Sequence, residues 1–71
     1  MIAKIKIVFR DESVRSWFMT FVEQNFQSEK RESKNFFSII EDLETSLIIE
    51  ATYQSILSIE KKDMDISIEL L

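Results

Sequence analysis

The fold is decided by the stretch Ile2–Phe9, with the sequence IAKIKIVF, in which successive side chains alternate between two faces. One face carries Ala3, Ile5, Ile7 and Phe9, and the other carries Ile2, Lys4, Lys6 and Val8. A period of two with β-branched residues is typical of a β-strand. Because the first face is wholly apolar, we expect it to lie against a hydrophobic core.

The period of the apolar residues changes directly after this strand. Asp11 is a suitable helix N-cap, and Glu12 places an anion in the first turn, where the helix dipole favours it. This pattern predicts an amphipathic helix from about Asp11 to Phe26. We interpret its aromatic residues as core rather than as a platform for nucleic-acid bases. The apolar stripe consists of Val14, Trp17, Phe18, Phe21, Val22 and Phe26.

The middle of the chain predicts a charged connection followed by a β-hairpin. Residues 27–35 contain no apolar side chain, and Phe36–Asp42 and Ser46–Thr52 are typical of two strands. Residues 41–45 lack the Asn-Gly or Asp-Gly of tight hairpins, so we expect a longer loop built on a type I turn.

The segment 53–71 fits two structures. At helical spacing, Ile56, Leu57, Ile59, Met64, Ile66, Ile68, Leu70 and Leu71 fill one broad arc. Read at a period of two, residues 65–70 form an alternating strand, which would need a turn at 61–64 that contains no strong turn residue. The pattern favours the helix, and the strand is the alternative.

These elements predict one α+β domain over residues 1–71. Its expected architecture has two layers in the order β-α-β-β-α, with a three-stranded antiparallel sheet and two helices on one sheet face. Met1 is followed by no apolar targeting segment, and the longest apolar runs have three residues, such as 7–9. We therefore expect a cytoplasmic protein with no membrane association.

The composition excludes most catalytic chemistries. The chain has 71 residues without Cys, His or Gly, and its net charge is −4. Thiolate and imidazole nucleophiles, their metal sites and glycine-rich phosphate loops are therefore absent. We interpret the acidic cluster Glu41, Asp42 and Glu44 as a solvated turn rather than a cation site. The expected protein is not an enzyme and has no cofactor, metal site or catalytic residue.

The side of the sheet away from the helices predicts an interface. The pattern leaves large apolar side chains there on adjacent strands, and such a patch usually marks an interaction site. The second strand contributes either Phe36 and Ile40 or Phe37 and Ile39, whichever pair points away from the helices. The predicted dimer interface consists of Ile2, Val8, Phe36, Ile40 and Ile48.

Two further surfaces are candidate contact sites. The last helix is expected to dock a larger partner by helix packing, through Ile56, Ile59, Glu60 and Asp63. A possible RNA contact consists of Lys4, Lys6, Lys30, Arg31 and Lys34.

The order of elements resembles the Pcc family, the small dimerising subunit of the KEOPS complex, which assists threonylcarbamoyl-adenosine formation in tRNA. The similar segments are the opening strand Ala3–Phe9, the Asp11-Glu12 helix start, the strand Ser46–Ala51 and the pair Ser55-Ile56. The chain departs from the family at Leu57 and Ser58, where Arg and Ala are usual, and at Lys61 and Lys62, where Asn and Ser are usual. This pattern looks like a diverged, archaeal-like paralogue.

The resemblance implies a non-catalytic assembly subunit of a KEOPS-like complex. It would form a heterodimer with a standard Pcc-type subunit, or a homodimer, and would contact a Kae-type ATPase directly or indirectly. A possible indirect contact with tRNA would follow from the complex. Two alternatives remain. The acidic second half of the chain suits an inhibitor that blocks a basic cleft of an enzyme, and the basic residues suit a weak RNA-binding accessory protein.

Overall fold

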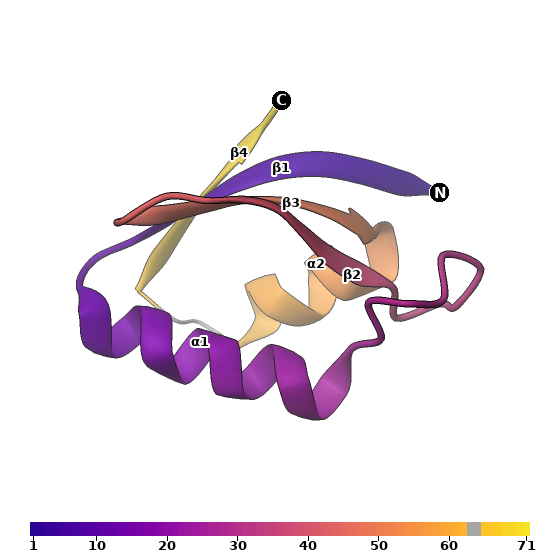
Figure 1. Cartoon of the computed structure of the whole chain (residues 1–71), viewed down its shortest axis with the longest axis horizontal. Coiled ribbons are helices and arrows are strands. Elements are labelled where there is room, and N and C mark those ends of the chain that lie inside the picture. Colours follow the sequence, from indigo (N-terminus) through magenta and orange to yellow (C-terminus); the bar gives the residue numbers. More distant parts are fainter. Residues whose placement is uncertain (63–64) are drawn as a thin grey trace.

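A computed structural model describes residues 1–62 and 65–71. The six elements follow one another in the order β-α-β-β-α-β (Figure 1). They are β1 (Ile2–Phe9), α1 (Glu12–Asn25), β2 (Phe37–Asp42), β3 (Ser46–Thr52), α2 (Tyr53–Lys61) and β4 (Ile66–Leu70).

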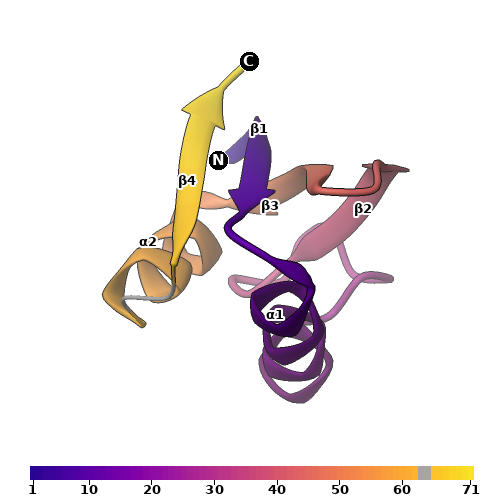
Figure 2. The same ribbon diagram turned by 90° about the vertical axis from the view of Figure 1, so that its left-hand side faces the viewer.

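All four strands form one antiparallel sheet with the order β2-β3-β1-β4. The strand β1 lies between β3 and β4, with Ile5 opposite Ile49 and Ile7 opposite Ile68. Both helices cover the same face of the sheet and leave the other face open (Figure 2). This element order is the split β-α-β arrangement of ferredoxin-like domains.

The α+β class and the placement of both helices on one face are confirmed, whereas the three-stranded sheet and the β-α-β-β-α order are wrong. The predicted last helix ends at Lys61, and the alternative strand is the one that forms. The reason is that β1 would otherwise keep an unpaired edge. The N–H of Arg10 donates to the carbonyl of Asp65 at 3.2 Å, and the N–H of Leu71 donates to the carbonyl of Lys4 at 3.2 Å.

The core lies between the sheet and the helices and is built around phenylalanine rings. Phe18 lies 5.3 Å from Phe9 and 5.9 Å from Phe37, measured between ring centroids, and the Phe26 and Phe37 rings stack at 5.4 Å. Aromatic pairs at these separations favour one another beyond the burial of their area. Trp17 differs from the expectation, because it is 50 % exposed and stacks on the outer side of Phe21.

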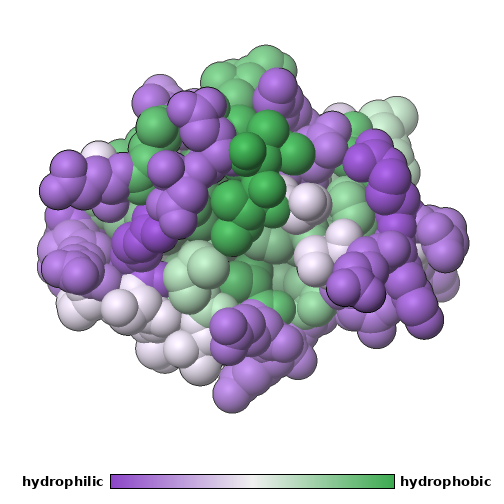
Figure 3. Space-filling view, in the orientation of Figure 1, coloured by the Kyte–Doolittle hydropathy of each residue, from purple (hydrophilic) through white to green (hydrophobic). Residues whose placement is uncertain are grey.

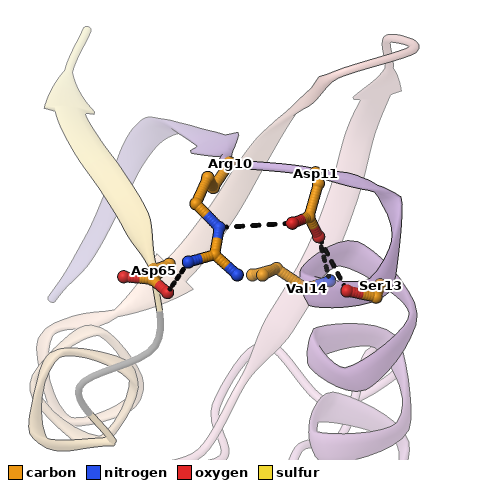
Figure 4. A network of polar contacts seen from close by, with 5 residues as sticks. All are labelled: Arg10, Asp11, Ser13, Val14 and Asp65. Carbon is orange, nitrogen blue, oxygen red and sulfur yellow. Dashed lines mark hydrogen bonds and ion pairs between the residues drawn. The ribbon is translucent and has the colours of Figure 1, made fainter.

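The start of α1 is held by Asp11, as its N-cap position predicts (Figure 4). Its carboxylate accepts hydrogen bonds from Ser13 Oγ at 2.8 Å and from the Val14 N–H at 3.0 Å. The Arg10 guanidinium bridges Asp11 and Asp65, at 3.2 and 2.6 Å, and so links the start of α1 to the start of β4. The hydrogen bond from Ser13, the one from Val14 and the nearby Arg10 together lower the pKa of Asp11.

This lowered pKa predicts a pH-dependent cap. The folded pKa of Asp11 lies below the unfolded one, so its contribution to stability is present above about pH 4 and is lost as the pH falls through the folded pKa. We expect Asp11→Ala to lower the melting temperature at neutral pH, and the difference from the wild type to shrink in acid. The variant Asp11→Asn, which keeps an uncharged acceptor, is the control. A difference that stays constant with pH in circular dichroism melts would contradict the assignment.

Candidate protein-binding surface

The open face of the sheet carries charges of both signs in opposed pairs. Lys4 on β1 lies opposite Glu50 on β3, and Lys6 lies opposite Glu69 on β4. Opposite charges at facing positions of antiparallel strands attract one another, so this face is nearly balanced although the chain is acidic. The carboxylates of Glu50 and Glu69 offset the charge of these lysines, so the face attracts an anionic polymer such as RNA only weakly.

The apolar part of this face is centred on Ile40 and Ile48. The register of β2 shifts between Ile39 and Glu41, so Ile40 is an extra residue and lies with Glu41 opposite Ile48. Ile40 is 48 % exposed, and Ile48 is half-buried. Val8 lies diagonally across from Ile48, since Val8 pairs with Ser46. These three side chains form a small apolar centre within the charged face.

The structure separates Phe36 from the predicted interface. Phe36 is only 1 % exposed, because the connection between α1 and β2 folds over it. The Arg31 guanidinium lies 5.2 Å from the centre of its ring and also pairs with Glu50 at 3.2 Å. Phe37, its neighbour, belongs to the core under the helices. The pair that points away from the helices is therefore Phe36 with Ile40, not Phe37 with Ile39. Of that pair, Phe36 is covered by its own chain and is not available to a partner.

The apolar surface continues around the edge of β2. Ile39 pairs with Ile49 and therefore points to the helix side, where it is 39 % exposed. It borders a shallow groove of about 380 Å³ between β2 and α1. In Figure 3, hydrophobic residues run down the middle of the view, over the sheet and into the space above α1. The apolar residues lining the groove are Met19, Val22, Phe26, Phe37 and Ile39.

The predicted docking surface on the last helix is not formed. Ile56 and Ile59 are buried in the core of this chain, because the helix lays that side against the sheet. Glu60 is exposed, and Asp63 lies outside the described residues. The side of α2 that faces outward carries Leu57, which is 54 % exposed.

The predicted basic residues fall on two different parts of the molecule. Lys4 and Lys6 lie on the open face, and Lys30, Arg31 and Lys34 lie in the connection between α1 and β2. Only Arg31 joins the two parts, because it reaches Glu50, the residue opposite Lys4. The five residues therefore do not form one continuous basic surface.

The acidic turn after β2 has a structural role that the sequence did not reveal. Arg15 of α1 donates from Nη2 to both carboxylate oxygens of Asp42, at 2.7 and 2.8 Å, and from Nη1 to the carbonyl of Leu43 at 3.1 Å. No local signal connects residues so far apart in the chain. Within residues 1–62 and 65–71, no group of three acidic, His or Cys side chains is placed to hold a metal ion.

The comparisons with known proteins give no neighbour: the chain matches no protein-family model, no curated protein and no solved structure. Among the described residues, no helix is long and apolar enough to cross a membrane.

The cover over Phe36 gives a testable prediction. We expect Arg31→Ala to expose the Phe36 ring and so to increase the fluorescence of a dye that binds apolar surface. The unfolding free energy should fall by about 1 kcal/mol, because a cation–π contact and an exposed ion pair are lost. Lys30→Ala is the matched control, and equal dye fluorescence in both variants would contradict this role of Arg31.

Proposed function

We propose that the chain is a non-catalytic assembly subunit that binds a protein partner through the open sheet face and the β2 edge. The observation that carries this proposal is the cluster of partly exposed apolar side chains Val8, Ile40 and Ile48 on adjacent strands, next to the groove that Ile39 lines. An apolar centre with a charged rim is the usual anatomy of a protein interface. Partly exposed apolar side chains gathered on adjacent strands are costly in water unless a partner covers them.

The balanced charges of the open face favour a protein partner over RNA. Lys4 and Lys6 already face Glu50 and Glu69, and Arg31 pairs with Glu50. A nucleic acid would have to compete with these carboxylates, whereas a protein surface can match both signs. The same balance argues against an inhibitor that acts through acidity on this face.

The more specific form of the proposal is a subunit of a KEOPS-like complex for tRNA modification. It rests on the sequence resemblance to the Pcc family, and the partners would be a Pcc-type subunit and a Kae-type ATPase. The fourth strand is a further departure, because the family pattern ends in a long helix and this chain ends its sheet with β4. The test is to isolate the tagged protein from its host and to identify bound proteins by mass spectrometry.

The open face is tested by Ile48→Asp. Ile48 lies opposite both Lys6 and the Ile40–Glu41 bulge, so a charge there enters the centre of the proposed surface. We expect affinity for the isolated partner to fall at least about thirtyfold, as for the loss of an interface hot spot. Circular dichroism should show an unchanged fold.

The matched control for this test is Leu57→Asp. Leu57 is also an exposed apolar residue, but it lies on α2 in the helix layer. This variant should bind the partner as the wild type does. Equal binding by both variants would overturn the proposed surface, and recovery of neither KEOPS-type protein from the host would overturn the specific form.

A further inference from the structure

We infer that a second copy of this chain pairs with the free edge of β4 and so doubles the sheet. This goes beyond the proposed function, because it uses a different surface and a different partner. The inference rests on which backbone groups of β4 are already bonded, and on how its side chains would meet those of a copy.

The alternation of hydrogen bonds shows which groups of β4 are free. Residues 65 and 71 bond to Arg10 and Lys4, so the odd-numbered residues of this segment face β1. The N–H and C=O groups of Ile66, Ile68 and Leu70 therefore point outward, and within residues 1–62 and 65–71 no other strand pairs with them. β4 is the last strand of the sheet on this side. Such an edge is a template for another strand.

The other edge of the sheet is protected in ways that β4 is not. On β2, the carbonyl of Gln27 already accepts from the N–H of Phe37, at 3.4 Å. The bulge at Ile40 breaks the regular spacing, and Glu41 and Asp42 follow it. Bulges, charges and covering segments are common means of blocking an edge. β4 has regular pairing along its length and contains one charged residue, Glu69.

Only one register pairs all the free groups of β4 with those of a copy. In an antiparallel pair about a two-fold axis at Ile68, Ile68 faces itself and Ile66 faces Leu70 of the other copy. Each of these residues then donates its N–H to the facing residue of the copy and accepts from that residue's N–H with its C=O. An axis at Ser67 would pair only Ile66 with Ile68 of the copy within residues 65–71, and an axis at Glu69 would pair only Ile68 with Leu70, so each leaves one of the three residues without a partner there.

The side chains suit this same register. Ile66, Ile68 and Leu70 lie on the helix side, opposite Phe9, Ile7 and Ile5, so their pairing extends the apolar layer. Leu70, which is 79 % exposed, would face Ile66 of the copy. On the open face, Glu69 would lie between its own Lys6 and Ser67 of the copy. No like charges meet, which is the complementarity that a symmetric interface requires.

The register is tested by cysteine substitution, since the chain has no native Cys. Facing residues in a hydrogen-bonded antiparallel pair have Cα atoms about 5.5 Å apart, within disulfide reach. We expect Ile68→Cys to form a covalent dimer under mild oxidation on a non-reducing gel. Ser67→Cys is the control, because it faces residue 69 of the copy and is too far from its own equivalent. A disulfide-linked dimer of Ser67→Cys, or none with Ile68→Cys, would overturn the register.

The association itself is tested by charge at position 67. Ser67→Glu places a carboxylate opposite Glu69 of the copy, twice in the dimer, and we expect the dissociation constant from sedimentation equilibrium to rise about fivefold. Ser67→Lys should lower it by about the same factor. The same two substitutions at Ser38, on the open face of the opposite edge strand, are the controls and should leave it unchanged.

The outcomes separate this inference from the proposed function. If sedimentation equilibrium gives the mass of a monomer for the wild type at all concentrations, the β4 pairing is overturned. Partner binding through the open face is not affected by that result. Ile48→Asp, in turn, should leave the dissociation constant of the dimer unchanged, because Ile48 lies on β3 and not at the β4 edge. A dimer lost in Ile48→Asp would show that the copies meet through the face instead.

Discussion

The position of β1 between β3 and β4 is the constraint on which the rest of the structure depends. Its odd-numbered residues bond to β3 and its even-numbered residues bond to β4, as the contacts of Phe9 with Thr45 and of Arg10 with Asp65 show. The same alternation sends Ile5 and Ile7 into the core, where both are fully buried. A central strand that is bonded on both sides leaves no freedom of register, because a shift of one residue would exchange its apolar and charged faces.

The connection between α1 and β2 determines which apolar side chains remain available. It folds over Phe36 and supplies Arg31 as a cover, and the N–H of Gln27 bonds to Asn35 within it. The bulge that follows at Ile40 has the opposite effect, because it leaves an isoleucine exposed on the open face. Phe37, the first residue of β2, and its neighbour Phe36 thus point to opposite sides of the sheet, and each is buried for a different reason.

The polar contacts tie elements that are distant in the sequence. Arg10 connects the start of α1 with the start of β4, and Arg15 connects α1 with the turn after β2. The Arg10–Asp65 pair is exposed on both sides, and a pair of this kind contributes at most about 1 kcal/mol. The Arg15 side chain is only 22 % exposed, and it also donates to the carbonyl of Leu43. The main effect of these two pairs is therefore to orient α1 across the sheet, while the phenylalanine core supplies most of the stability.

The sequence by itself determined the elements whose periodicity is strong. The alternation in Ile2–Phe9 and the helical stripe after Asp11 predicted β1 and α1 within a residue or two, including the N-cap, because local pattern and local hydrogen bonding agree there. The hairpin strands β2 and β3 followed from their apolar faces in the same way. The tertiary structure decided the last strand, the cover over Phe36 and the burial of Ile56 and Ile59. Each of these features depends on contacts with another part of the fold. β4 forms because it pairs with β1, Phe36 is covered by the guanidinium of Arg31, and Ile56 and Ile59 are buried against the helix-covered face of the sheet.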